Sequence, residues 1–151
     1  MVLALLRILM GGMFLAVWAD NLRKHLYTPS GYRDFVGDLA DKTQVTFYGD
    51  FIRQIVVPNA ALFARGQLVL ELVVMGAFLL IGFLTPVSAL IAAGFSVNLL
   101  LASWGVPGEW QGTYVMMIAI LLAVAVTQAG RTLGVDARLA RKHPKPRLPV
   151  Y

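Results

Sequence analysis

Four long apolar runs constrain the fold of this chain more than any other feature. They cover Val2–Leu22, Leu68–Leu84, Pro86–Trp104 and Thr113–Ala129, and each has about the 20 residues that a helix needs to cross a bilayer. Charged residues make up 14% of the chain, whereas soluble domains contain about 25%. Too little polar surface remains to cover a water-soluble particle. The sequence therefore predicts an all-α integral membrane protein built as a four-helix transmembrane bundle.

The charge distribution predicts two parts and a topology. Residues 1–130 form the expected membrane domain, and residues 131–151 form a basic tail. Six basic residues and Asp136 in segment 131–147 account for the whole net charge of +5. A basic segment that directly follows a span is the usual cytoplasmic flank, so four spans place both termini in the cytoplasm. Aromatic residues at the opposite level resemble an interfacial belt: Trp18, Tyr27, Trp104, Trp110 and Tyr114.

Because the net positive charge belongs to the tail alone, no nucleic-acid partner is expected. The simpler interpretation of the tail is a topology signal alone. The alternative is contact with anionic lipid or with a cytoplasmic partner. The residues available for such contact are Arg131, Arg138, Arg141 and Lys142.

The external segment, at about residues 27–63, has amphipathic patterns of its own. Phe35, Val36 and Leu39 fall on one helical face and three aspartates fall on another, and Phe47–Val57 is a second such stretch. Pro58 is placed as the first residue of the next helix. We expect two short helices on the outer surface, acting either as a structured cap or as a lid over a binding site.

Small residues at helical spacing indicate how the spans pack. Helices in lipid associate through close contact of small residues and through polar contacts. Arg7 is expected to extend to the cytoplasmic surface. The second span offers Gly76 and Gly82. The predicted packing stripes on the other spans are Gly12–Ala16–Asp20 with Gly11 and Ala19 beside it, Ser88–Ala92–Ser96 and Ala119–Ala123–Thr127.

Glu71 is the only ionisable residue in the run Leu68–Leu84. An acid at this depth costs about 2.5–3.5 kcal/mol on insertion scales, so we expect partners or a function. It is either a structural tie between helices or part of a pocket for a polar head group, such as a quinone ring or a lipid head, or of a proton relay. The candidate polar cluster in the outer half of the membrane comprises Glu71, Gln67, Asn98, Asp20 and Arg65, with Arg65 paired to Asp20.

Several kinds of chemistry are excluded by composition. The chain has no cysteine, which removes thiolate metal sites and iron–sulfur clusters. The only histidines, His25 and His143, fall on opposite sides of the predicted membrane and cannot ligate one haem. No zinc spacing or phosphate-binding loop is present. We expect no catalytic residue, metal or redox centre of the chain's own, hence a non-catalytic subunit rather than a stand-alone enzyme. A bound quinone is the one cofactor that the composition leaves as an alternative.

Three motifs in order resemble the DoxX family, which includes DoxD-type proteins. They are Arg7-Ile-Leu-Met-Gly-Gly-Met-Phe-Leu, Gly66-Gln-Leu-Val-Leu-Glu71 and Gly130-Arg-Thr-Leu-Gly-Val-Asp136. The resemblance implies a four-helix, multi-pass protein of the cytoplasmic (inner) membrane of a prokaryote. DoxD relatives are membrane subunits of thiosulfate:quinone oxidoreductase.

Three functions therefore stand as hypotheses. The first is an accessory or anchoring subunit of a respiratory or quinone-linked oxidoreductase complex. The second is a non-redox assembly subunit of another membrane complex. The third is a small transporter or a lipid- or quinone-binding protein, although no inverted repeat supports transport. The expected partners are the lipid bilayer and other membrane subunits.

Overall fold

A bundle of apolar helices forms the body of the protein. The computed structural model describes residues 1–142, and every regular element within them is helical. His143, Lys145 and Arg147 lie outside the described residues. The long apolar helices are α1 (Val2–Arg23), the continuous helix Ala60–Ile81, α6 (Thr85–Ser103) and the shorter α7 (Gly112–Val126). The first three are long enough to cross a bilayer. The predicted all-α membrane bundle is confirmed.

The second apolar helix begins earlier than the sequence predicts. It contains α4 (Ala60–Val69), the π-helical segment η2 (Leu70–Phe78) and α5 (Leu79–Ile81). Arg65 interrupts its apolar pattern, but the side chain is exposed and leaves the helix intact. The placement of Pro58 as the first helical residue is wrong, because the helix begins at Ala60 after the N-cap residue Asn59.

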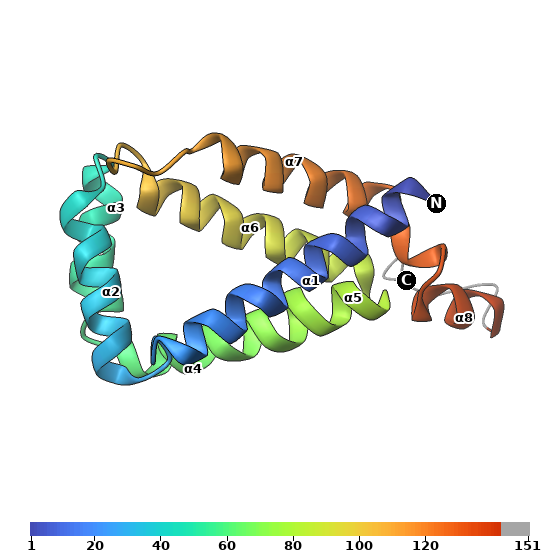
Figure 1. Cartoon of the computed structure of the whole chain (residues 1–151), viewed down its shortest axis with the longest axis horizontal. Coiled ribbons are helices and arrows are strands. Elements are labelled where there is room, and N and C mark those ends of the chain that lie inside the picture. The colour runs from blue at the N-terminus through green and yellow to red at the C-terminus, as the bar shows by residue number, and fades with distance from the viewer. Residues whose placement is uncertain (143–151) are drawn as a thin grey trace.

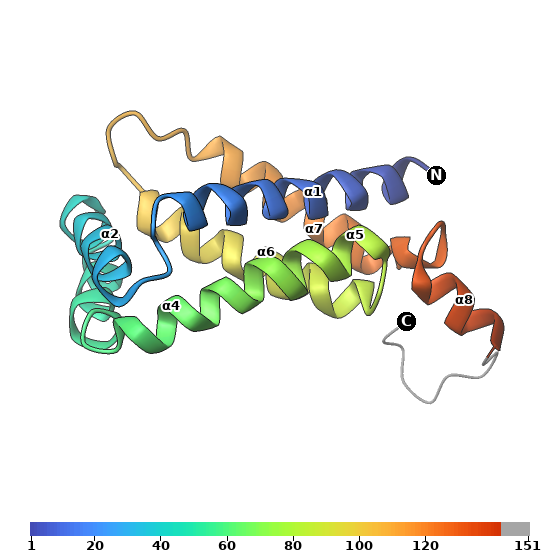
Figure 2. The ribbon, with the colours of Figure 1, turned by 60° about the horizontal axis from the view of Figure 1, so that its bottom comes forward.

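The bundle has two distinct ends (Figure 1). One end, here called the insert end, carries α2 (Pro29–Lys42), α3 (Thr46–Phe51) and the π-helical η1 (Ile52–Val56). The other, here called the tail end, holds the N-terminus, the 3-10 turn η3 (Ala129–Arg131) and α8 (Val135–Lys142). A turned view keeps these elements at the same opposite ends (Figure 2).

The insert helices form a small core of their own against the bundle. Thr28 caps α2 by accepting a hydrogen bond from the Gly31 amide at 3.1 Å, and Pro29 opens the helix. Arg53 donates to the Ala40 carbonyl at 2.7 Å and to the Asp41 carboxylate at 3.1 Å, which fastens η1 to the end of α2. The predicted short amphipathic helices are confirmed. Their buried residues include Tyr32, Val36, Tyr48, Ile52 and Val56.

Only one of the three predicted packing stripes is buried. Ser88, Ala92 and Ser96 of α6 are buried, as expected. The stripe on α7 is wrong, because its three small residues are exposed and α7 instead buries Met117, Leu121 and Val124. These larger side chains pack against the alanines of α6, so one small-residue surface is sufficient for two helices to approach.

The stripe on α1 is also wrong by one position. Ala16 and Asp20 are exposed, and nothing lies within 4 Å of a Cβ built on Gly12. A Cβ on Gly11 would lie 2.6 Å from the backbone nitrogen of Leu80. Gly11 is therefore the residue that lets α1 approach the second apolar helix.

Candidate functional site

Glu71 is buried near the insert end, where three hydrogen bonds meet its carboxyl group. Its side chain is 1% exposed. Oε1 accepts from Gln67 Nε2 at 2.6 Å, and Oε2 accepts from Asn21 Nδ2 at 3.0 Å and from the Tyr27 hydroxyl. The donors come from α4, from α1 and from the link that follows α1. These hydrogen bonds offset part of the free energy that is lost when the acid is removed from water.

Glu71 lies at the start of the π-helical segment η2. A π-helix inserts an extra residue into the turn and is frequent at functional sites. Within η2, Gly76 is buried, and a Cβ there would lie 2.5 Å from the Leu15 side chain. This close approach presses η2 against α1 and brings Glu71 within reach of Asn21.

The structure brings together only part of the predicted polar cluster. Gln67 contacts Glu71. Asn98 instead accepts a hydrogen bond from the Tyr48 hydroxyl of α3. The predicted pairing of Asp20 with Arg65 is wrong, because Asp20 forms a 2.6 Å ion pair with Lys24 on the surface. The sequence placed these residues at similar depth, but they point in different directions around their helices.

Asn21 and Tyr27 are the partners that sequence reasoning missed. Asn21 follows the buried Phe14 by seven residues, which places both on one face of α1; this spacing could have identified it. The sequence assigns Tyr27 to the interfacial aromatic belt, and no sequence pattern connects it with Glu71. Burial and the hydrogen bond to Glu71 raise the pKa of Tyr27 above its usual value, so the hydroxyl stays protonated and donates a hydrogen bond to the carboxyl group.

A cavity of about 310 Å³ adjoins Glu71, and we call it the inner cavity. Asn21, Gln67 and Glu71 contribute its polar wall. The remaining wall is largely aromatic and aliphatic. It includes Phe14, Phe35, Phe95, Leu99, Tyr114 and Met117.

A second cavity of about 450 Å³ lies between α4 and α6, and we call it the side cavity. Gln67 and Phe95 line both cavities. Leu62, on the rim, is 72% exposed, and Ile91 opposite is also exposed. The side cavity therefore joins the apolar flank of the bundle to the two residues that also border the inner cavity.

A second pair of buried charges, Arg7 and Asp136, lies at the tail end. The predicted extension of Arg7 to the surface is wrong, because its side chain is 0% exposed. It donates to the carbonyls of Leu79 and Leu133 at 3.0 and 2.9 Å. The Asp136 carboxylate accepts from the amides of Leu84 and Thr85, both at 2.9 Å.

Each tail-end charge matches the helix end that it contacts. Arg7 meets a carbonyl near the C-terminus of α5, and Asp136 meets amides at the start of α6, which is the polarity that the helix dipole favours. Glycine leaves room for this arrangement. A Cβ on Gly82 would lie 1.9 Å from Arg7 Nη1, and one on Gly130 would lie 2.1 Å from Thr85 Oγ1. We call Arg7, Asp136 and these glycines the tail-end knot.

Neither site has the composition of a metal centre. Within residues 1–142, no three His, Cys, Asp or Glu side chains are grouped so that they could hold a metal ion. The polar side chains that line the inner cavity carry a carboxyl group, two amides, the Thr113 hydroxyl and the Tyr114 phenol, which are hydrogen-bonding partners for an organic ligand.

The comparisons with known proteins identify the family. No curated protein and no solved structure matches the chain. The model of one family matches residues 2–148 and is described as "TQO small subunit DoxD". The sequence motifs resemble both the DoxX and the DoxD types, and this match identifies the DoxD type. The chain is a membrane protein that belongs to the DoxD family.

Proposed function

We propose that this chain is a membrane subunit of a quinone-linked oxidoreductase complex and that it holds a quinone head group in the inner cavity. The observation that carries the proposal is a buried carboxyl group with three side-chain donors beside an apolar cavity of about 310 Å³. Ligand pockets of this size are mostly apolar with a few convergent polar groups. The description of the family as a TQO subunit supports the same assignment.

The polar wall suits both redox forms of a quinone. A quinone carbonyl accepts hydrogen bonds, and the Gln67 and Asn21 amides are donors. A quinol hydroxyl donates, and the Glu71 oxygens are acceptors. The aromatic rings of Phe14, Phe95 and their neighbours provide apolar contact for a quinone ring. One set of side chains can therefore hold the ligand before and after reduction.

The side cavity offers the ligand a route from the bilayer. Its rim contains the exposed residues Leu62 and Ile91, and its inner wall contains Gln67 and Phe95, which also border the inner cavity. An isoprenoid tail can lie along this apolar rim while the head group reaches Gln67. Movement of the Gln67 and Phe95 side chains is then the step that admits the ring.

Electrons must come from another subunit in this proposal. Reduction of a quinone takes up two electrons and two protons, and the described residues offer no redox-active metal set. The chain is then an accessory subunit, with Glu71 and Tyr27 at the insert end available to pass protons. Tyr27 donates a hydrogen bond to Glu71 and stands in the link between α1 and the insert helix α2.

The binding test uses decylubiquinone and the purified chain in detergent, with quenching of tryptophan fluorescence as the readout. Glu71→Gln keeps the shape but removes the acid, and Leu99→Phe narrows the inner cavity without adding a tryptophan and without removing a hydrogen bond of Glu71. We expect each to weaken binding about tenfold or more, which is about 1.4 kcal/mol, because one variant removes the acid that meets the head group and the other takes up space in the cavity. Asp34→Asn, an exposed acid, is the matched control and leaves binding unchanged.

The alternative is that Glu71 only links helices and binds no ligand, and its hydrogen bonds support this alternative too. Its three hydrogen bonds join α1, the link after α1 and α4. The tie alone predicts that Glu71→Gln lowers the free energy of unfolding, while parent and both variants bind decylubiquinone equally or not at all. That result contradicts the quinone site.

The proposed orientation places both termini in the cytoplasm of a prokaryote. The chain has no cysteine, so Ser30→Cys and Lys142→Cys each create a single thiol on an exposed residue. A membrane-impermeant maleimide applied to intact spheroplasts is expected to label the cysteine at position 30 only. Labelling of position 142 alone reverses the orientation.

A further inference from the structure

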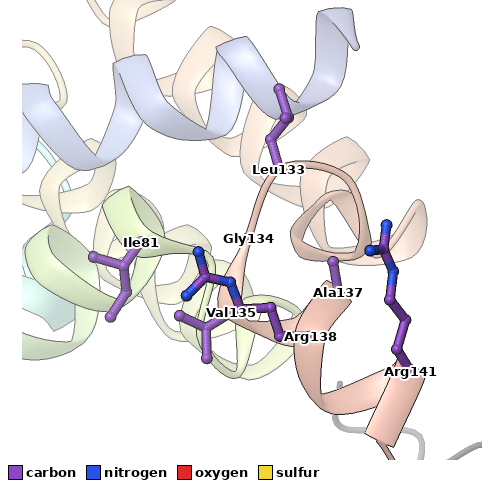
Figure 3. A pocket seen from close by; sticks show the side chains of 7 residues that line it. All are labelled: Ile81, Leu133, Gly134, Val135, Ala137, Arg138 and Arg141. Carbon is purple, nitrogen blue, oxygen red and sulfur yellow. The ribbon is translucent and has the colours of Figure 1, made fainter.

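The tail end carries a cavity of about 450 Å³ that the quinone proposal does not use (Figure 3). One wall is apolar and consists of Ile81, Leu133 and Val135. The other side carries two arginines of α8, Arg138 and Arg141. The cavity therefore combines an apolar surface with two positive charges, which is the pattern of a site for an anionic amphiphile.

Both arginines are available to a ligand. Their side chains are exposed, and neither has a hydrogen bond or an ion pair to another described residue. Figure 3 shows the Arg138 guanidinium extending toward Ile81 and the Arg141 guanidinium extending alongside Ala137. The two cations thus stand on either side of the helix start instead of pointing together into solvent.

The apolar wall is held in place by the tail-end knot. Leu133 has a left-handed backbone with φ of 57°, which is unusual for a residue other than glycine. Its carbonyl accepts from Arg7 at 2.9 Å, while its side chain is 62% exposed. The strained backbone therefore keeps the Leu133 side chain directed outward, away from Ile81 (Figure 3). Ile81 is itself exposed at the end of a spanning helix.

The start of α8 is fixed by the same knot. Asp136 is 1% exposed, its amide donates to the Gly82 carbonyl at 2.8 Å, and its carboxylate binds the start of α6. Arg138 and Arg141 follow it on the same short helix. The two cations are therefore held at a fixed position relative to the end of the spanning helices, which lowers the entropy lost when they bind a ligand.

We propose that this cavity binds one anionic phospholipid. The phosphate binds the Arg138 guanidinium, which extends toward Ile81 (Figure 3), since a guanidinium matches phosphate oxygens in charge and in planar geometry. Arg141 adds a second positive charge at the rim of the cavity, and the acyl chains lie along Ile81 and Val135. The apolar wall is the reason for choosing a lipid over free inorganic phosphate, and its continuity with a spanning helix is the reason for choosing a lipid over an acidic peptide.

The test is native mass spectrometry of the detergent-solubilised chain titrated with dioleoylphosphatidylglycerol or dioleoylphosphatidylcholine. Arg141→Ala and Lys142→Ala form a matched pair, because both remove one exposed charge from α8 but only Arg141 lines the cavity. A basic residue near a membrane contributes about 1 kcal/mol to binding of anionic lipid, or about fivefold in affinity. We expect Arg138→Ala and Arg141→Ala each to weaken binding of phosphatidylglycerol by about this factor, and Lys142→Ala to leave it nearly unchanged.

Two further arms separate the lipid from other sources of phosphate. Ile81→Ser removes apolar wall without changing charge and is expected to weaken binding of phosphatidylglycerol. Excess inorganic phosphate is expected not to displace the lipid. The proposal is overturned if phosphatidylcholine binds as tightly as phosphatidylglycerol, if phosphate competes, or if Lys142→Ala and Arg141→Ala have equal effects. Unchanged thermal unfolding of the variants shows that loss of binding is not loss of fold.

Discussion

Glu71 and Asp136 are both 1% exposed, yet the two ends of the bundle satisfy them in different ways. At the insert end, side chains donate to Glu71, and a cavity of about 310 Å³ lies next to it. At the tail end, backbone amides donate to Asp136, and close glycine contacts surround it. Backbone donors cannot turn toward a ligand, whereas amide and phenol side chains can. The difference assigns a structural role to the tail-end acid and leaves the insert-end acid able to bind.

The largest expected effect comes from removing one charge of the tail-end knot. Arg7→Met leaves Asp136 buried without a nearby cation, and Asp136→Asn leaves Arg7 without a nearby anion. The described structure has no direct ion pair between Arg7 and Asp136, so each variant removes a longer-range charge interaction and removes or weakens the backbone hydrogen bonds of the replaced residue. Leaving buried polar groups unsatisfied in this way costs about 1–3 kcal/mol. Both single variants should therefore lower the free energy of unfolding by about that amount, measured with denaturant in mixed micelles.

The double variant and a surface control complete this test. Arg7→Met with Asp136→Asn removes both charges and should cost less than the sum of the single losses by about 1–3 kcal/mol. Arg65→Met changes an exposed cation and should alter stability by no more than about 0.5 kcal/mol. If Arg7→Met lowers the free energy of unfolding no more than Arg65→Met does, the buried charges of the tail end do not have the structural role assigned to them.

Two glycines test the difference in packing between the ends. Gly82 has φ of 69°, and a Cβ there would lie 1.9 Å from Arg7 Nη1. Gly66 lines the side cavity, and nothing lies within 4 Å of its added Cβ. Gly82→Ala should cost about 1–3 kcal/mol, while Gly66→Ala should gain about 0.5–1 kcal/mol from helix propensity. Equal losses at both positions, measured by thermal unfolding, would contradict a packed tail end and an open insert end.

Sequence reasoning predicted the helices well because their physical basis is local. Apolar composition over about 20 residues decides whether a segment can span a bilayer, and the four runs all became helices. The contact between Gln67 and Glu71 was predictable for the same reason, since residues four apart share a helical face. These are statements about one helix at a time.

Contacts between helices were predicted less well, because depth in the membrane does not fix direction around a helix axis. Asp20 and Asn98 have the depth expected of partners for Glu71, but one is on the surface and the other contacts Tyr48. Arg7 and Asp136 are far apart in sequence, and both lie beside the turn between α5 and α6 only because the chain after α7 folds back. No local sequence pattern predicts the π-helical turn at Glu71. None predicts that the chain after α7 folds back to the turn between α5 and α6.

The Glu71 cluster should be less costly to break than the tail-end knot. Tyr27→Phe removes one donor and Gln67→Leu removes another, while the remaining donors still satisfy the carboxyl group in part. Each should lower the free energy of unfolding by about 1 kcal/mol. Losses as large as those of Arg7→Met, under the same denaturant conditions, would remove the energetic distinction between a ligand-binding acid and a structural one.

The expected effect of Tyr48 at the insert end depends on pH and appears only in base. Burial raises the pKa of Tyr48 from 10.0 to about 12, so the folded chain keeps this proton in a pH range where the unfolded chain has lost it. The associated stability is fully present below pH 10 and is lost as pH rises toward 12. Tyr48→Phe should therefore reduce the fall in unfolding free energy across this range. Asn98→Ala removes the acceptor of the Tyr48 hydroxyl but not its burial, so it should lower stability at every pH and keep the slope. An unchanged slope in Tyr48→Phe would show that Tyr48 is not the group that couples the insert end to pH.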